Sequence, residues 1–169
     1  MTFVTYDGTY GKTDKVLSFI QQFDAAFGGE DFDESSKLRH VSMYLLKSGK
    51  KWWSSLRMAK TAPMTWKACR KAIMDQFLTD HAQDDILAEW RGLHLDKGES
   101  IKKYIDRFWD LHLKACVFEE ISFQAQKHQY CAGLPEDMQA YVNAQKPTTI
   151  SAVIHHSMLA YKIDRKSVV

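Results

Sequence analysis

The stretch 96–115 constrains the fold of this 169-residue chain more than any other part of the sequence. It opens with the turn residues Asp96-Lys97-Gly98, after which apolar side chains recur every three or four positions. This spacing places them on one face of a helix. The residues of that face are Ile101, Tyr104, Ile105, Phe108, Leu111 and Ala115. The stretch therefore predicts a turn followed by an amphipathic helix with one buried face.

The first half of the chain repeats this periodicity in shorter stretches. The predicted helices span 13–27, 33 or 35 to 47, 51–56 and 65–77. We expect Thr13 to cap the first of them, Gly28-Gly29 to end it with residues that tolerate positive φ, and Gly49 to interrupt the second. Residues 2–8 are β-prone and lead into Asp7-Gly8, so they predict a short extended arm.

The second half begins where the apolar period is lost, over residues 78–83, and restarts at Ile86. The helices predicted after this boundary span about 86–93, 101–115, 123–132, 135–144 and 149–162. The sequence thus predicts an all-α protein of two helical lobes, residues 1–82 and 83–169, with about four and five helices.

Composition narrows the class of protein. The chain has 23 Lys and Arg against 21 Asp and Glu, a formal net charge of +2, which argues against a polycation that binds nucleic acid over its whole surface. Three cysteines at long spacings fit neither a disulfide framework nor a zinc module, which indicates reduced thiols. The sequence has no signal peptide and no apolar run of membrane-spanning length, so we expect a cytoplasmic protein without a membrane segment.

Several short motifs follow one another in order along the chain. They are the arm Phe3 to Thr9, the segment Leu45 to Trp53 with its tryptophan pair, Met64-Thr65-Trp66, Gly98 to Phe108, Gly133-Leu134-Pro135 and Thr148-Thr149-Ile150. Each is weak alone, but their succession resembles the Gag capsid region of gypsy-type long-terminal-repeat (LTR) retrotransposons and of host genes domesticated from them. The segment 97–108 is also similar to the major homology region of retroviral capsids.

The resemblance implies a structural protein that catalyses nothing and needs no cofactor. Its lobes would meet in rings of five or six and pair as a dimer through the C-terminal lobe, so that the oligomer closes into a virus-like particle enclosing RNA. The alternative is an Arc-like, domesticated interaction module whose N-terminal lobe binds an extended peptide in a groove. The sequence leaves open whether the chain belongs to a mobile element or to a captured host gene.

The major-homology-like segment supplies a candidate structural network. Glu99 lies where a helix begins, a place that suits a capping carboxylate, and the planar donors of Arg107 suit a carboxylate or carbonyls of a neighbouring turn. The alternative for Arg107 is a solvated surface residue. The candidate network consists of Gly98, Glu99, Tyr104, Arg107 and Phe108.

Aromatic residues supply candidate contact surfaces, although core packing is the simpler interpretation of most of them. Because Trp52 and Trp53 are adjacent, both cannot point along one helical direction, and one of them is expected to face the arm or a partner. The candidates for the groove and arm are Phe3, Tyr6, Phe23, Phe27, Trp52 and Trp53. The candidates for contacts between lobes or subunits are Trp109, Phe118, Phe123 and Tyr130.

Basic residues concentrate in the region of the third and fourth predicted helices. The candidates for a face toward a polyanion are Lys50, Lys51, Lys67, Arg70 and Lys71, with a solvated surface as the alternative. The sequence contains no nucleophile-and-base motif, and its histidines lack H-E-x-x-H or paired-cysteine spacing, so it predicts neither a catalytic nor a metal site.

Overall fold

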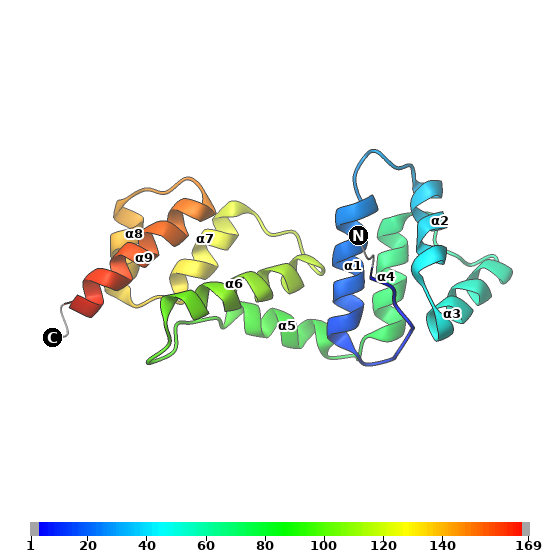
Figure 1. Ribbon diagram of the computed structural model, residues 1–169, viewed down its shortest axis with the longest axis horizontal. Coiled ribbons are helices and arrows are strands. Elements are labelled where there is room, and N and C mark those ends of the chain that lie inside the picture. The colour runs from blue at the N-terminus through cyan, green and yellow to red at the C-terminus, as the bar shows by residue number, and fades with distance from the viewer. Residues whose placement is uncertain (1–3, 167–169) are drawn as a thin grey trace. The chain divides into compact units, whose positions relative to one another are not determined.

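The computed structural model describes residues 4–166 and confirms the all-α prediction (Figure 1). The described part of the chain has nine helices and no β-strand, only one isolated β-bridge. The chain divides between Ala82 and Gln83 into two compact units, which are described in turn. None of the helices within 4–166 combines the length and the apolar character that a bilayer crossing requires.

The first unit contains four helices. They are α1 (Thr13–Phe27), α2 (Glu34–Tyr44), α3 (Lys47–Met58) and α4 (Trp66–Phe77). Asp33 begins α2 by accepting a hydrogen bond from the Ser36 N–H at 2.7 Å, and Thr65 begins α4 by accepting one from Ala68 N–H at 3.1 Å. The prediction for α1 was wrong in detail, because Thr13 is its first helical residue and no side chain caps it.

The connection between α2 and α3 differs from the prediction. Gly49 does not interrupt a helix but lies buried within α3, and the chain instead turns extended at Leu45 and Leu46. The arm explains the difference. A Cβ on Gly8 would lie 2.2 Å from the backbone nitrogen of Gly49, so the two glycines allow the arm to pack directly against the helix backbone.

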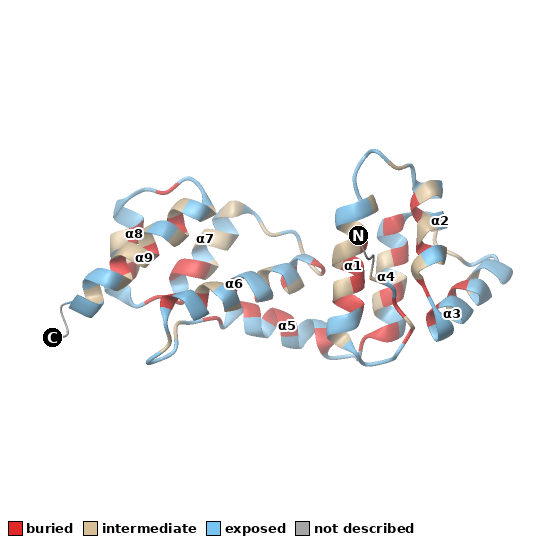
Figure 2. Ribbon diagram, in the orientation of Figure 1, coloured by how far each residue is buried: buried red, intermediate tan, exposed pale blue. Residues whose placement is uncertain are grey.

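The core of the first unit lies between α1, α2, α4 and the arm (Figure 2). Its fully buried side chains are Tyr6, Val16, Leu17, Phe19, Ile20, Phe23, Val41, Leu45, Cys69 and Ile73. Burying one large apolar side chain in this way stabilises the fold by about 1.5–3 kcal/mol, so Tyr6 of the arm contributes to the stability of the first unit.

The end of α1 differs from the expectation of a residue with positive φ, since Gly28 is right-handed with φ −72°.

The second unit contains five helices. They are α5 (Ala82–Arg91), which begins at the division, α6 (Ile101–Cys116), α7 (Phe123–Ala132), α8 (Glu136–Ala144) and α9 (Ile150–Lys166). The last helix, α9, packs against α6, α7 and α8. Its Ser157 hydroxyl lies 2.7 Å from the Tyr130 hydroxyl of α7, in the core. This buried polar pair fixes the position of α9 against α7.

Candidate functional site

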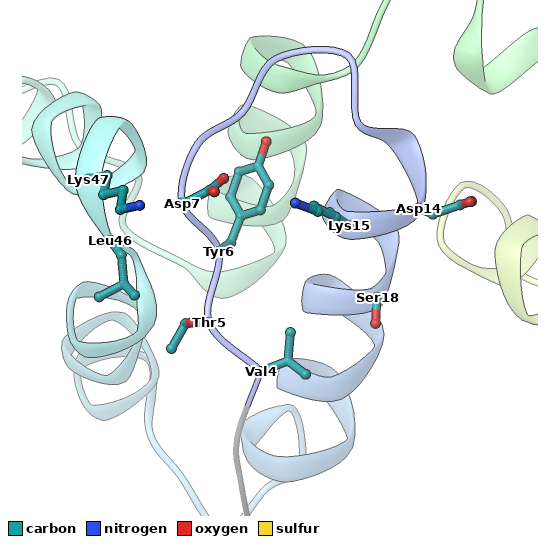
Figure 3. A pocket seen from close by; sticks show the side chains of 9 residues that line it. All are labelled: Val4, Thr5, Tyr6, Asp7, Asp14, Lys15, Ser18, Leu46 and Lys47. Carbon is teal, nitrogen blue, oxygen red and sulfur yellow. The ribbon is translucent and has the colours of Figure 1, made fainter.

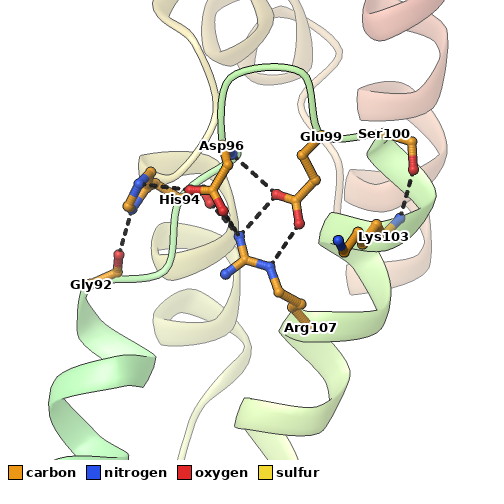
Figure 4. Close-up of polar contacts among 7 residues, drawn as sticks. All are labelled: Gly92, His94, Asp96, Glu99, Ser100, Lys103 and Arg107. Atoms are coloured by element: carbon orange, nitrogen blue, oxygen red, sulfur yellow. Dashed lines mark hydrogen bonds and ion pairs between the residues drawn. The ribbon is translucent and has the colours of Figure 1, made fainter.

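The turn before α6 forms from the residues that the sequence singled out (Figure 4). Gly98 adopts the left-handed conformation with φ +82°, which glycine enters without steric cost. The Glu99 N–H donates to the Asp96 carbonyl at 3.0 Å, and the Asp96 N–H donates to Glu99 Oε1 at 3.1 Å. Ser100, not Glu99, caps the helix, because its hydroxyl accepts from the Lys103 N–H at 3.2 Å. The expected capping role of Glu99 was therefore wrong.

Arg107 joins this turn to α6 through a two-pronged ion pair. Its Nε lies 2.8 Å from Glu99 Oε2 and its Nη2 lies 2.9 Å from Oε1, while Nη2 also donates to the His94 carbonyl at 2.6 Å (Figure 4). Asp96 Oδ2 lies 3.5 Å from the same nitrogen. We call Asp96, Glu99, Arg107 and the His94 carbonyl the turn clamp.

The electrostatics of the turn clamp follow from its hydrogen bonds, which outweigh the opposing effect of burial on both groups. The Glu99 side chain is 5% exposed and the Arg107 side chain 35% exposed. The hydrogen bonds from Arg107 lower the pKa of Glu99, and Glu99 in turn raises the pKa of Arg107. Both groups are therefore charged at neutral pH. Both carboxylate oxygens of Glu99 accept hydrogen bonds from within the turn clamp.

The other two members of the predicted network lie beneath the clamp. Tyr104 and Phe108 are fully buried, and the Tyr104 hydroxyl donates to the Tyr130 carbonyl at 2.8 Å. Burial raises the pKa of Tyr104 far above its usual range. A Cβ on Gly133 would lie 2.3 Å from the Tyr104 hydroxyl, which explains the glycine at the end of α7. These residues hold the turn, α6 and α7 together.

The N-terminal arm is the second candidate site. The Tyr6 N–H donates to the Tyr44 carbonyl at 3.0 Å, and the Leu46 N–H donates to the Tyr6 carbonyl at 2.8 Å, as in one step of a parallel strand pair. The Tyr6 ring packs 5.2 Å from that of Phe77, and its hydroxyl donates to the Thr9 carbonyl at 2.7 Å. Burial raises the pKa of Tyr6 to about 12.

An open hollow of about 520 Å³ lies beside the arm (Figure 3). One wall is formed by Lys15 and Ser18 of α1, and another by Leu46 and Lys47 at the start of α3. Asp7 lies between them, and hydrogen bonds from Thr9 lower its pKa, with both lysines adding to the effect. Charged side chains therefore lie at its edges beside the apolar surface of Val4, Tyr6 and Leu46, and the sequence had singled out only Tyr6 among these residues.

The six residues predicted for the groove and arm do not come together around this hollow. Phe3 lies outside the described residues, and Tyr6 contributes from the arm. Phe23 and Trp53 are buried, so they were wrong as groove residues: α1 and α3 turn these positions inward. Phe27 and Trp52 are half-buried. Phe27 stacks on His40 with ring centroids 4.3 Å apart, and Trp52 lies 5.2 Å from Phe77.

The predicted subunit contacts separate by exposure. Tyr130 is fully buried and was wrong as a surface contact, because its hydroxyl pairs with Ser157 inside the unit. Phe118 and Phe123 are half-buried and pack against the core. Trp109 is 37% exposed on α6, and four residues further along Leu113 is 54% exposed, a neighbour that the sequence reading missed.

The predicted polyanion face is partly neutralised by carboxylates. Arg70 Nη1 lies 3.2 Å from Asp24 Oδ2, and Asp24 also accepts a hydrogen bond from the indole of Trp66. Lys71 Nζ lies 2.6 Å from Asp75 Oδ2. The remaining members, Lys50, Lys51 and Lys67, are exposed.

Comparison with known proteins does not assign this chain to a family. No family model matches the sequence, and no curated protein does either. Among solved structures, the chain is similar to a dARC1 capsid domain dimer, with 16% identity, 93% of each chain covered and a TM-score of 0.45. A likeness at this level is too weak to assign the chain to a family.

Proposed function

We propose that this chain is a Gag-type capsid protein of gypsy LTR origin that assembles with copies of itself into particles enclosing RNA. The observation that carries the proposal is the turn clamp. The segment that resembles the major homology region forms a self-contained turn and helix in which Glu99 and Arg107 satisfy each other. In the proposal, such a segment serves to stiffen the unit that carries it.

The arrangement of the chain suits assembly. Particles of one protein need rigid units that meet in more than one way, and this chain has two compact units. In the proposal, residues 1–82 form the lobe that meets in rings of five or six, and residues 83–169 form the lobe that pairs as a dimer. The exposed Trp109 and Leu113 on α6 are the apolar surface that we assign to such contacts.

A catalytic role is not part of the proposal. Burial raises the pKa of the Cys69 thiol to about 12 and also raises the pKa values of Cys116 and Cys131. An activated cysteine nucleophile needs the opposite shift. We accordingly propose a structural protein. We place it in the cytoplasm because its three cysteines are free thiols.

Electron microscopy of the purified chain tests the assembly directly. At high protein concentration and raised salt, we expect spheres or tubes, because salt screens repulsion between like-charged copies. Monomers by light scattering under every condition would contradict the proposal. Nucleic acid extracted from nuclease-treated particles, absent from a matched preparation without particles, would show that they enclose RNA.

Exposed lysines on α3 offer a test of the RNA contact. Lys50→Ala with Lys51→Ala should weaken RNA retention and reduce its dependence on salt, because two phosphate contacts are lost. Lys71→Ala is the matched control, since this lysine already pairs with Asp75. Equal retention by both variants would contradict a role for the α3 lysines.

The second candidate function is peptide binding by the first unit. The arm favours this function, because it is an extended segment that pairs with the backbone at Leu45 and lies beside the 520 Å³ hollow. In this reading, a domesticated chain would exchange its own arm for a partner segment. Calorimetry of a chain lacking residues 1–10 with a synthetic 1–10 peptide should then show saturable binding. A scrambled peptide is the control, and equal heats from both would contradict this function.

A further inference from the structure

A second hollow in the first unit, of about 360 Å³, lies between α2, α3 and the segment that leads from α3 to α4. Its volume is within the range of about 300–1,000 Å³ that is typical of small-ligand pockets. Helix α2 contributes Arg39 to its lining and α3 contributes Arg57, and both arginines are exposed. We call this feature the arginine hollow.

Helical spacing brings both arginines to this place. Arg39 follows Ser35 by four positions on α2, and Arg57 follows Trp53 by four positions on α3, so each pair shares one face of its helix. All four residues line the hollow. Two helices of the folded unit therefore hold the donors, which places them more precisely than a loop would.

The chain itself does not neutralise the two arginines. Among residues 4–166, neither Arg39 nor Arg57 makes a side-chain ion pair or hydrogen bond. The carboxylates at the start of α2 are engaged elsewhere: Asp33 caps the helix, and Glu34 accepts from the Trp66 N–H at 2.7 Å. Asp33 acts on Arg39 only through space. Two positive charges therefore meet at one hollow, where they repel each other unless an anion lies between them.

Trp53 adds an unsatisfied donor to the lining of the hollow. The residue is 3% exposed, and its Nε1 has no hydrogen-bond partner among the described residues. Buried polar groups are normally hydrogen-bonded, so this donor needs an explanation. Because Nε1 is covered from solvent, an anion contacts the arginines first. An oxygen of the anion that reaches the indole would then supply the missing acceptor.

The charge of the hollow favours a phosphate monoester as its ligand. The planar donors of arginine match phosphate oxygens in pairs. A phosphate monoester carries about −1.5 to −2 charges at pH 7, so one group balances both arginines, whereas a carboxylate carries a single charge. The internal phosphates of RNA also carry one charge each. Leu38 and Pro63 line the same hollow and provide apolar surface for the organic part of the ligand.

We infer that the arginine hollow binds a small organic phosphate monoester, with Arg39 and Arg57 on the phosphate and Leu38 and Pro63 against the organic part. A phosphate held by both arginines ties α2 to α3. The inference goes beyond the proposed function and does not depend on it, because the RNA contact was assigned to other residues, the lysines of α3.

Titration of the full chain with phenyl phosphate, followed by NMR, tests the site. The side-chain Nε–H signals of Arg39 and Arg57 should shift together and saturate at one ligand per chain. Benzenesulfonate has the same ring with one charge, and inorganic phosphate has the charge without the ring, so each should bind about threefold to tenfold more weakly. No saturation at millimolar phenyl phosphate would overturn the site, and equal affinity for benzenesulfonate would overturn the choice of a monoester.

A single-stranded RNA without terminal phosphates is the competing ligand. It should leave the signals of the two arginines unchanged. If this RNA shifts them and displaces phenyl phosphate, the hollow is a nucleic-acid contact and the inference is wrong.

Variants assign the donors. Arg39→Ala and Arg57→Ala should each weaken phenyl phosphate binding about tenfold. Arg57→Lys should restore only part of it, because lysine keeps the charge and loses the planar donors. Lys51→Ala is the matched control, since Lys51 is an exposed cation on α3 six positions before Arg57 and so on another face. Wild-type affinity in Arg57→Ala, or an equal loss in Lys51→Ala, would overturn the assignment.

Two further measurements separate binding from folding and from assembly. Because both arginines are exposed and unpaired, urea denaturation without ligand should be the same for Arg39→Ala, Arg57→Ala and wild type. Trp53→Phe keeps a ring and removes the N–H, so it should weaken binding about threefold, and an unchanged affinity would overturn the part given to the indole. Particle formation by Arg57→Ala tests the proposed function separately, so the two can fail independently.

Discussion

The two units close their cores in different ways. In the second unit, Glu99 and Arg107 are eight residues apart, so the turn clamp forms within one turn and the helix after it. In the first unit, the arm closes the core through contacts with residues far along the chain, Tyr6 with Leu45 and Gly8 with Gly49. Long-range closure costs more chain entropy and here depends on a close fit of two backbones. We therefore expect one added methyl group in the arm to cost more than a lost charge in the clamp.

Gly8→Ala should have the largest effect of the substitutions considered. Gly8 has φ +81°, and its new Cβ would lie 2.2 Å from the Gly49 nitrogen, which is backbone and cannot move aside alone. We expect the arm to detach and the free energy of unfolding to fall by about 3–5 kcal/mol. Urea denaturation measures the loss, and hydrogen exchange should place it in the first unit.

Gly11→Ala is the matched control for this variant. Gly11 has φ +78°, but the atom nearest to its new Cβ is Cγ2 of Thr79, at 3.8 Å. The free energy of unfolding should therefore fall only by the cost of placing alanine in the left-handed backbone conformation, about 1–2 kcal/mol. Equal losses in both variants would show that the approach of the two backbones does not hold the arm.

Arg107→Ala should have the next largest effect. It removes the charged donors to Glu99, whose side chain is 5% exposed, and the donor to the His94 carbonyl. Fully buried pairs cost about 3–5 kcal/mol when broken, but the 35% exposure of Arg107 lets water reach the site, so we expect about 1.5–3 kcal/mol. Thermal melts measure the loss, with the exposed Lys103→Ala as control. A melt identical to wild type would contradict the clamp.

The sequence predicted the local features of this molecule better than the distant ones. Arg107 and Glu99 belong to one short segment, and the resemblance to the major homology region placed both in one network, although the sequence did not pair the two side chains directly. Gly49 was misread because the reason for a glycine inside α3 is the arm, some forty residues earlier. No periodicity within α3 carries that information.

Tyr130 shows the same limit within the second unit. Helix α7 is short and has few apolar residues, so its inward face was not evident from the sequence. In the fold, the Tyr130 hydroxyl pairs with Ser157 on α9, and its backbone carbonyl accepts a hydrogen bond from Tyr104 on α6. Both partners come from other helices. The all-helical fold was predictable because each helix carries its own period, whereas the faces left exposed depend on how the helices pack.

The pH dependence of stability should report the clamp more finely. Hydrogen bonds from Arg107 lower the pKa of Glu99 in the folded state, so around pH 4 the unfolded chain binds more protons than the folded one. The stabilisation is therefore fully present above about pH 4.5 and is lost as pH falls through the folded pKa. Glu99→Gln should be less stable than wild type by about 1–2 kcal/mol at pH 7, and the gap should close on acidification. Urea titrations from neutral to acidic pH measure it; a gap that stays constant would contradict the assigned pairing.

Lys71→Ala should have the smallest effect and tests what makes the clamp strong. Lys71 Nζ lies 2.6 Å from Asp75 Oδ2, closer than Arg107 Nε lies to Glu99, but the two side chains are 74% and 64% exposed. If distance decided the energy, this pair would match the clamp. Because water screens an exposed pair and holding two mobile side chains costs entropy, we expect less than about 0.5 kcal/mol in urea denaturation. A loss equal to that of Arg107→Ala would mean that solvent exposure does not decide the strength of the two ion pairs. The burial of Glu99 would then not explain the stability of the turn clamp.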